Sequence, residues 1–312
     1  MFGKGCKADT MRVKVILNPR SGQGRAREQT GMIDALGHRY GDLDIVPTQR
    51  PGHAAELAAA AAGEGYDLVA AAGGDGTVHE VICGLVGDGD RAALPLGIIP
   101  IGSGNDLAFG LGIHEKPEEA VQRVFTGTRR AIDLGRVVDD RGRSAVFHNN
   151  LGIGFDAIVV MRTETISRIQ GFLMYLTAVL QTIAFYYETP YMEMTFDGQP
   201  VNQRALFLYA GVGPRGGGGF LMTPDARWDD DRIDTCLCNP VGRLTMLAML
   251  TRVMKGTHVT SPHVTMRRNH TITARSSSPM PIYVDGEMFA YPRDDVHEVT
   301  ITSVPAAVEV MV

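Results

Sequence analysis

A glycine-rich turn carries the strongest chemical signal in the sequence. Residues 73–77 read Gly-Gly-Asp-Gly-Thr, after a run of small apolar residues and before a helical pattern. Glycines let backbone N–H groups approach a phosphate closely, and the N-terminus of the next helix adds unpaired donors and a positive dipole end. Asp75 would repel that phosphate unless a divalent cation or a proton stood between them, so its place indicates Mg²⁺ coordination or proton handling. The alternative is an Asp-Gly turn or helix N-cap without a ligand.

Three further segments resemble phosphate-facing turns, namely residues 18–22, 48–53 and 102–106, and each follows a predicted strand. Ligands of open α/β sheets bind beyond the carboxyl ends of the strands, so loops that are distant in sequence can share one site. The sequence contains neither the P-loop motif nor the glycine fingerprint of dinucleotide-binding folds, and the protein-kinase signatures are missing too. The sequence therefore predicts an anion site of a different type.

The elements that must position these turns alternate between strand and helix in the first third of the chain. Strands are predicted at residues 13–17, 44–46, 67–72 and 96–100, and helices at 25–36, 54–62 and 78–85. This alternation predicts a parallel sheet. From Ile132 onward strand-like runs dominate and predict mostly antiparallel sheet, which two helices, at 172–187 and 243–255, interrupt.

Composition narrows the class of protein. A length of 312 residues favours two domains, and 44% hydrophobic with 21% charged residues is ordinary for a chain with a buried core. A formal net charge of −5 argues against a nucleic-acid partner. The four cysteines are too sparse for a disulfide scaffold and the N-terminus lacks a signal-peptide pattern, so we expect a cytoplasmic protein.

These motifs, taken in order, resemble the diacylglycerol kinase catalytic-domain family, which includes bacterial diacylglycerol and related lipid kinases and the sphingosine and ceramide kinases. The resemblance spans nearly the whole chain. It rests on Asn18-Pro19 with Ser21-Gly22, Gly52-His53-Ala54, residues 73–77, Gly102-x-Gly-Asn105-Asp106, Asn150-x-Gly-x-Gly-Phe155-Asp156-Ala157, residues 217–219 and Asp285-Gly286-Glu287. Several short motifs in the right order are more specific than any one of them.

The resemblance implies an α/β plus mainly β fold. An NAD-kinase-like nucleotide-binding domain over residues 1–133 would be followed by a β-sandwich-like domain over residues 134–312. The last strand, about 305–312, would rejoin the first domain. The active site is expected in the cleft between the domains.

The resemblance also implies roles for residues. ATP would be bound by Asn18, Pro19, Arg20, Ser21, Gly22, Thr48, Gly73, Gly74, Gly76, Thr77, Glu80, Gly102, Ser103 and Asn105. Asp75 would act with Mg²⁺ at the phosphates. Asp285 or Glu287 would be the general base that accepts the proton of the acceptor hydroxyl, a contribution of roughly 10²–10⁴-fold. Taken alone, Asp285-Gly286 reads as an ordinary hairpin turn.

Two further metal roles follow only from the resemblance. Asp133 would reach the metal at Asp75 through its water shell, and the alternative is a turn residue of the domain linker. Asp229 and Asp231 lie in a stretch like the acidic loop that binds a structural Mg²⁺ in some members. This sequence has Asp231 where the family usually has glycine, and a solvated acidic turn is the alternative.

The function that the resemblance implies is ATP-dependent phosphorylation of a lipid hydroxyl, with diacylglycerol, a sphingoid base or ceramide as acceptor and a place in phospholipid synthesis. The alternatives are an NAD kinase or other small-molecule kinase, and a nucleotide- or lipid-binding regulator without turnover. The apolar segment 172–187 is shorter than the ~20 residues that span a bilayer, so peripheral membrane contact is expected. An edge strand would allow a homodimer.

Overall fold

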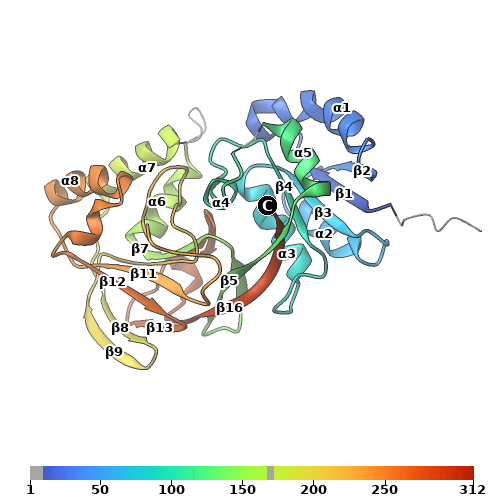
Figure 1. The fold of residues 1–312 in the computed structure, drawn as a ribbon. Coiled ribbons are helices and arrows are strands. Elements are labelled where there is room, and N and C mark those ends of the chain that lie inside the picture. Colours follow the sequence, from blue (N-terminus) through green and yellow to red (C-terminus); the bar gives the residue numbers. More distant parts are fainter. Residues whose placement is uncertain (1–9, 115, 167–171) are drawn as a thin grey trace, which may run out of the picture. The chain divides into compact units, whose positions relative to one another are not determined.

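The computed structural model describes residues 10–114, 116–166 and 172–312 (Figure 1). The chain divides into two units. Unit 1 comprises the described residues up to Gly102, with Leu111–Ala131 and Val308–Val312. Unit 2 comprises Ser103–Gly110 and the described residues of Ile132–Ala307. The sequence predicted one boundary at residue 133, whereas a short segment, Ser103–Gly110, already belongs to unit 2.

Unit 1 is built on a parallel sheet. Its strands follow the order β2-β1-β3-β4, and the end of β16 (Glu298–Met311) lies beside β4. The other bounds are Arg12–Leu17 for β1, Asp42–Pro47 for β2, Leu68–Gly73 for β3 and Leu96–Pro100 for β4. All neighbours pair in parallel, so the predicted parallel sheet is confirmed. The carboxyl ends of β1 to β4 therefore lie at one edge.

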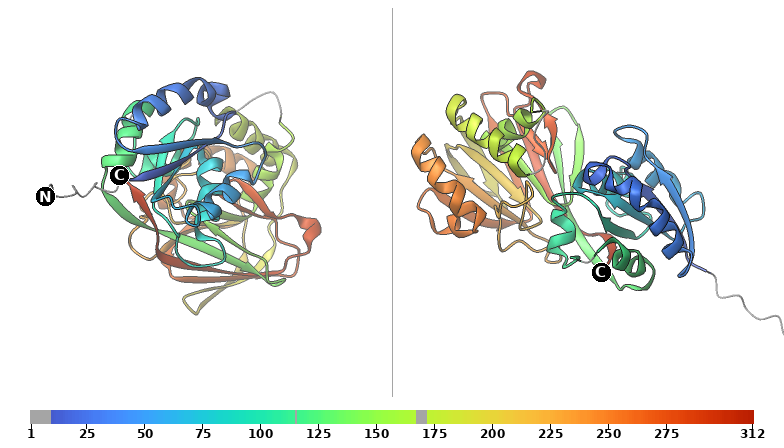
Figure 2. Two further views of the ribbon diagram at one scale, coloured as in Figure 1. Left: turned by 90° about the vertical axis from the view of Figure 1, so that its right-hand side faces the viewer. Right: turned by 90° about the horizontal axis from the view of Figure 1, so that it is seen from above.

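Helices cover both faces of this sheet. Figures 1 and 2 show α1 (Arg25–Gly37) and α5 (Pro117–Thr126) on one face, and α2 (His53–Ala61) and α3 (Asp75–Val86) on the other. Alternate residues of the strands serve the two faces: Val13 and Val15 join the core under α1 and α5, whereas the Lys14 ammonium reaches the α2 carbonyl of Leu57. Helix α5 was not predicted from the sequence.

Unit 2 contains two mainly antiparallel sheets, which confirms the β-sandwich-like expectation. One follows the order β16-β13-β8-β9, with β5 and β6 joined to it through β16, and the other follows β12-β11-β10-β7-β14-β15. The bounds are β5 (Arg129–Asp139), β6 (Ser144–Phe147), β7 (Asn150–Gly154), β8 (Tyr191–Phe196), β9 (Gln199–Arg204), β10 (Phe207–Gly211), β11 (Ile233–Cys238), β12 (Val264–Asn269), β13 (Thr271–Ser276), β14 (Ile282–Val284) and β15 (Glu287–Ala290).

Three helices pack on one face of the second sheet (Figure 1). They are α6 (Phe155–Thr163), α7 (Phe172–Phe185) and α8 (Arg243–Met254), and a shorter helix, α4 (Asp106–Gly110), also belongs to this unit. The sequence predicted only two helices in this half, because the β-branched run of α6 follows β7 directly and resembles a continued strand. No helix of the described residues is long and apolar enough to cross a bilayer.

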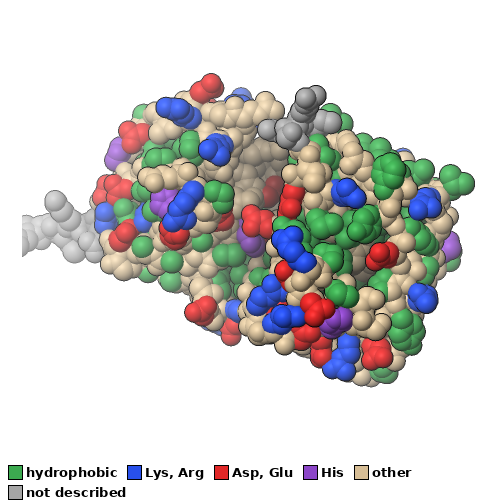
Figure 3. All heavy atoms as spheres, turned by 180° about the vertical axis from the view of Figure 1, so that it is seen from behind, with side chains coloured by type: hydrophobic (Ala, Val, Ile, Leu, Met, Phe, Trp, Pro, Cys, Tyr) green, Lys and Arg blue, Asp and Glu red, His purple; other side chains and the backbone are tan. Residues whose placement is uncertain are grey.

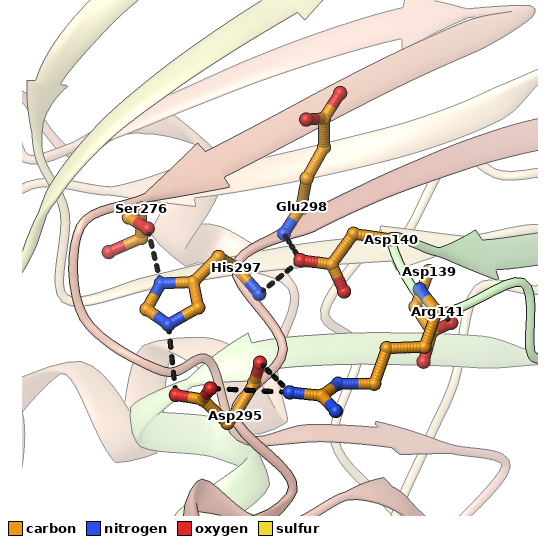
Figure 4. A network of polar contacts seen from close by, with 7 residues as sticks. All are labelled: Asp139, Asp140, Arg141, Ser276, Asp295, His297 and Glu298. Atoms are coloured by element: carbon orange, nitrogen blue, oxygen red, sulfur yellow. Dashed lines mark hydrogen bonds and ion pairs between the residues drawn. The ribbon is translucent and has the colours of Figure 1, made fainter.

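A network of polar contacts lies at the start of β16 (Figure 4). The His297 ring contacts oxygen atoms at both nitrogens: Nδ1 lies 2.9 Å from the Ser276 carbonyl oxygen and Nε2 lies 3.1 Å from Asp295 Oδ1. Asp140 accepts the backbone N–H groups of His297 and Glu298. Only the imidazolium donates from both nitrogens, so the Ser276 carbonyl first, and then Asp295, raises the pKa of His297.

This network predicts a pH-dependent contribution to stability. The pKa of His297 is higher in the folded than in the unfolded chain, so its stabilisation is complete below about pH 6.5 and is lost as the pH rises through the folded value. We expect His297→Gln to lower the free energy of unfolding in urea at pH 5.5 and to leave it nearly unchanged at pH 9. An equal loss at both pH values would show that the charge of the ring is irrelevant.

Candidate functional site

Four loops of unit 1 leave the carboxyl edge of the parallel sheet. The segment after β1 turns through a 3-10 helix, η1 (Ser21–Gly24), and the loop after β2 leads to α2. The loop after β3 enters α3 through Gly74, and the segment after β4 remains in unit 1 as far as Gly102. Unit 1 therefore brings together the predicted nucleotide residues of all four loops up to Gly102. Ser103 and Asn105 belong to unit 2.

The turn at residues 73–77 has space only for glycine at its first two positions. A Cβ on Gly73 would lie 2.4 Å from Thr77 Oγ1, and one on Gly74 would lie 3.1 Å from the Cα of Gly102. A Cβ on Gly76 would meet nothing within 4 Å. Gly76 is exposed in the first turn of α3, where helix N–H groups have no intrahelical partner. The open side of the turn at Gly76 has the form of an anion cradle.

Hydrogen bonds fix the loops around this turn. Asn18 Nδ2 donates to Thr77 Oγ1 at 3.1 Å, and Asn18 Oδ1 accepts the backbone N–H of Arg20 at 3.0 Å. The Thr48 N–H bonds the carbonyl oxygen of Leu17 at 2.8 Å, which ties the loop after β2 to β1. Asn18 and Thr48 thus hold the loops after β1 and β2 in place at the carboxyl edge of the sheet.

Glu80 has a role that the sequence did not reveal. Its Oε2 accepts the backbone N–H of Ala54, in the first turn of α2, at 3.1 Å. The carboxylate therefore supplies a partner for one of the unpaired N–H groups at a helix N-terminus. Through this bond α3 positions the start of α2 and the loop before it.

Asp75 is the acidic residue of the edge. It is half-buried and occupies the first turn of α3, where the helix dipole favours a negative charge. Mg²⁺ in phosphotransfer sites is commonly bound by one or two carboxylates together with substrate phosphates, and it keeps several waters. A carboxylate next to an open anion cradle fits that requirement.

In unit 2, Asp285 is held by the backbone of the segment before β7. Its Oδ1 accepts the N–H groups of Asn149 and Asn150 at 3.0 and 2.8 Å, and its Oδ2 accepts that of His148 at 2.8 Å. The side chain is 2% exposed, and Oδ2 also lies 2.6 Å from His148 Nδ1. Asp285 and Gly286 both have positive φ, as in a type I′ hairpin turn between β14 and β15. Asp285 therefore serves as a residue of the hairpin turn, and the same turn holds its carboxylate in place.

Glu287 differs from Asp285 in its surroundings. It begins β15 on the far side of the turn and is exposed to solvent. The sequence left the two carboxylates as equal candidates for the base. The geometry separates them: Asp285 is buried and held by backbone N–H groups, whereas Glu287 is exposed.

The other acidic residues of the sequence prediction have protein partners. Both oxygens of the buried Asp133 accept backbone N–H groups, from Asp231 at 2.7 Å and from Ala306 at 2.8 Å. The carboxylate of Asp231 lies 3.3 Å from His270 Nδ1, and that of Asp229 lies 3.2 Å from Arg227 Nε. Asp231 has a φ of +53°, so it adopts the backbone conformation that favours glycine.

Within the described residues, none of these three carboxylates belongs to a group of three or more acidic, His or Cys side chains close enough to share one ion. Asp133 ties the loop at 229–231 to β16 instead. The metal role of Asp133, Asp229 and Asp231 remains a prediction.

An apolar pocket lies between the second sheet and its three helices. Its accessible volume is about 90 Å³. Helix α6 contributes Val159, α7 contributes Val179 and Ile183, and α8 contributes Met246 and Leu250. The predicted apolar helices at 172–187 and 243–255 are thus the walls of this pocket, and their inner faces form part of the core.

One wall of the pocket is polar. The carboxylate of Asp156 accepts the hydroxyl groups of Tyr175 at 3.1 Å and Tyr283 at 2.6 Å, and all three residues line the pocket. Burial raises the pKa of Asp156, and the two tyrosine hydroxyls lower it by a smaller amount. Tyr283 lies in β14, two residues before Asp285, so the two Cα atoms are about 7 Å apart along the strand.

Comparison with known proteins assigns the chain to a family. A family model described as the diacylglycerol kinase catalytic domain matches residues 12–137, and one described as the YegS C-terminal NAD kinase beta sandwich-like domain matches residues 149–312. The chain belongs to the diacylglycerol kinase family. It is 32% identical over 303 residues to a diacylglycerol kinase of Mycobacterium tuberculosis, covering 96% of this chain and 94% of that protein.

More distant members of the diacylglycerol kinase family share the same organisation. A diacylglycerol kinase of Bacillus subtilis is 27% identical over 282 residues, with 88% of this chain and 89% of that protein covered. A crystal structure of a diacylglycerol kinase from Bacillus anthracis has a TM-score of 0.74 at 21% identity and covers 98% of each chain. That structure supports the fold, and the names of the sequence relatives indicate a kinase.

Several residues of the site escaped the reasoning from sequence. Asp156 stands in the sequence only as part of a motif, although an acidic residue two positions after a strand that ends in glycine is a usable signal. Asp106, also noted only in a motif, is buried, and it accepts the N–H of Gly218 at 3.0 Å and pairs with Arg215 at 2.7 Å. It thereby fixes the glycine turn at 216–219. The tyrosines of the pocket carried no signal, because each is an ordinary core residue in the sequence.

The glycine turn of unit 1 gives a matched pair of variants. We expect Gly73→Ala to destabilise the fold strongly, because its Cβ collides with Thr77, and this would appear as a lowered midpoint in thermal unfolding. Gly76→Ala should unfold like the wild type but bind nucleotide more weakly, because its Cβ enters the open side of the cradle. Titration calorimetry with ATP measures the second effect. Unchanged affinity in a folded Gly76→Ala protein would show that no phosphate lies there.

Proposed function

We propose that this chain is an ATP-dependent kinase that transfers a phosphoryl group to a lipid hydroxyl. One observation carries the proposal: strand β14 contributes Tyr283 to the polar wall of the apolar pocket and ends at the held carboxylate of Asp285. A pocket lined mainly by apolar side chains suits acyl chains, and the adjacent carboxylate suits activation of a hydroxyl.

ATP would bind at the carboxyl edge of the sheet in unit 1. The N–H groups at the start of α3 and the open face at Gly76 would receive phosphate oxygens, and Asn18, held against Thr77, would order the loop after β1. Asp75 would hold Mg²⁺, which neutralises charge on the phosphates when it is bound. The remaining nucleotide residues of the prediction belong to the same loops, except Ser103 and Asn105 of unit 2.

Asp285 would accept the proton of the acceptor hydroxyl. As the O–H bond breaks, the lipid oxygen forms a bond to the γ-phosphorus, and the bond between that phosphorus and the bridging oxygen of ADP breaks. Three backbone N–H groups keep the carboxylate in place, and the imidazole of His148 lies close enough to share the proton. The base acts on a hydroxyl that the pocket presents nearby.

The lipid acceptor distinguishes this proposal from an NAD kinase-like or other small-molecule kinase. A soluble polar acceptor would gain nothing from a pocket lined by Val159, Val179, Ile183 and Met246. A regulator without turnover would not need a carboxylate fixed by three backbone donors. Both alternatives are outcomes of the assay below.

Access to a lipid in a bilayer requires a docking surface, and we propose the outer faces of α7 and α8. Their inner faces line the pocket, whereas Leu173, Phe185 and Leu244 are 62%, 79% and 82% exposed. Hydrophobic side chains gather at the upper right of Figure 3, over the end of unit 2 that carries these helices. Residues 172–187 carry no charge, and residues 243–255 carry Arg243, Arg252 and Lys255 without an acidic residue, which suits an anionic membrane.

Transfer of labelled phosphate from ATP to lipid in mixed micelles tests the activity. We expect wild-type transfer in the presence of Mg²⁺, and a drop of about 10²–10⁴-fold in Asp285→Asn. Asp75→Asn should lose activity and require more Mg²⁺, whereas the exposed Glu287→Gln should stay near the wild-type rate. ATP binding without transfer to any lipid would contradict the proposal and favour a soluble acceptor or a regulator.

The docking surface is tested by sedimentation with vesicles. A fully buried Phe or Leu side chain contributes roughly 1.5–3 kcal/mol, so the double variant Phe185→Ser, Leu244→Ser should bind vesicles containing phosphatidylglycerol at least about 10-fold more weakly. Tyr40→Ser, which changes an exposed aromatic residue of unit 1, is the matched control. If the double variant bound vesicles as strongly as the control does, α7 and α8 would not be the docking surface.

A further inference from the structure

Tyr209 holds a polar group that the fold does not use. It lies in β10, is 1% exposed and lines the apolar pocket. Its hydroxyl has no hydrogen-bond partner among the described residues. A buried hydroxyl without a partner costs free energy, so such a group in a pocket wall points to a bound ligand.

The register of three neighbouring strands explains where this hydroxyl stands. Gly152 of β7 is the direct partner of Tyr209 on β10 and of Tyr283 on β14. Directly opposed residues project from the same face of a sheet, so the two tyrosines flank a position without a side chain. A Cβ on Gly152 would lie 2.2 Å from a ring carbon of Tyr283 and 2.8 Å from Asp156 Oδ2, so that space is taken by the ring and the carboxylate. The result is a polar strip across the apolar pocket.

Only one donor of this strip remains for a ligand. The hydroxyls of Tyr175 and Tyr283 both contact Asp156. Burial first, and then the nearby Asp156, Asp106 and Asp285, raises the pKa of Tyr209 well above its usual range, so its proton stays in place. Tyr209 is therefore a neutral donor.

The hydroxyl lies at the end of the pocket where the chemistry is proposed. A Cβ on Gly216 would lie 2.9 Å from the Tyr209 oxygen and 2.8 Å from Asn150 Nδ2. Gly216 lines the pocket, and Asn150 is the residue whose N–H holds Asp285. The side chain of Asn150 therefore lies near the Tyr209 hydroxyl, and the N–H of the same residue contacts Asp285.

We propose that the Tyr209 hydroxyl donates a hydrogen bond to the acyl carbonyl oxygen beside the reacting hydroxyl, and that it selects acylated lipids over lipids without a carbonyl group. The inference rests on the proposed lipid kinase activity and names the substrate feature that this site reads. The free group of the strip is the hydroxyl donor of Tyr209, which suits a carbonyl oxygen, whereas the ammonium group of a sphingoid base has no lone pair to accept it. A site built to hydrogen-bond one group discriminates strongly against analogues that lack it.

The experiment compares two acceptors that differ only in this carbonyl, 1,2-dioctanoylglycerol and its diether analogue 1,2-dioctylglycerol. Steady-state kinetics of the full chain are measured in the same micelles. We expect Tyr209→Phe to lower kcat/KM for the diester on the order of 10-fold and to leave the diether value unchanged. The KM for ATP should not move. Tyr191→Phe, at a tyrosine of β8 that is 49% exposed, is the matched control.

A second variant guards against misfolding of the first. Gly216→Ala places a methyl group against the Tyr209 hydroxyl and should reduce the preference for the diester in the same direction. Equal losses on both acceptors, or no loss on the diester, would overturn the role of Tyr209 while leaving the kinase intact. A wild-type protein that phosphorylates neither acceptor would instead overturn the lipid kinase activity and, with it, this inference.

Discussion

The hydrogen bonds of the Asp285 carboxylate are the constraint on which the proposed acceptor site depends. Three consecutive N–H groups, from His148 to Asn150, converge on one side chain, and the Asp285 N–H returns to the Asn150 carbonyl oxygen at 2.8 Å. This clasp fixes the start of β7 against the end of β14. Because side chains alternate along a strand, fixing the start of β7 also fixes which face of the sheet Gly152 occupies. It also fixes where α6, which carries Asp156, begins.

Missing side chains matter as much as present ones. In unit 1, Gly73 and Gly74 leave room for Thr77 and for the chain at Gly102, so the turn closes tightly and its open face stays at Gly76. In unit 2, Gly152 leaves room for the ring of Tyr283 and the carboxylate of Asp156. Both cases follow one rule: a backbone position against which another group packs closely cannot carry a Cβ.

The sequence predicted the alternating elements of unit 1 because each strand there is a short apolar run followed by a glycine or proline signal. It predicted the change to antiparallel sheet near Ile132 because strand-like runs dominate from that residue onward. It missed α6, whose β-branched residues are typical of strands, and it could not show that Ser103–Gly110 belongs with unit 2. That assignment depends on contacts such as Asp106 with Arg215, which are separated by more than a hundred residues.

The residues of the candidate site that belong to sequence motifs were predictable. Those that come together only through packing were not. Asp75 and Asp285 stand out through the ordered motifs that contain them, because each Asp-Gly pair taken alone reads as an ordinary turn. The sequence could not separate Asp285 from Glu287, because their difference in burial and in backbone donors arises only in the fold. Tyr175, Tyr209 and Tyr283 come from three separate elements and meet only through the register of β10, β7 and β14 and the packing of α7.

A buried carboxylate in an apolar pocket is a poor way to stabilise a fold. Removing such a group from water costs on the order of several kcal/mol, and apolar residues of similar volume would often be as stable or more so. The two tyrosine hydroxyls on Asp156 offset part of that cost, and they do so without a positive charge that would bind the carboxylate permanently. The consequence concerns orientation. An acyl chain satisfies the walls formed by α6, α7 and α8 but not the polar strip, whereas a polar head satisfies the strip but not the walls. An amphiphile with its polar end at β10, β7 and β14 would satisfy both, and in the proposed site its hydroxyl would then face Asp285.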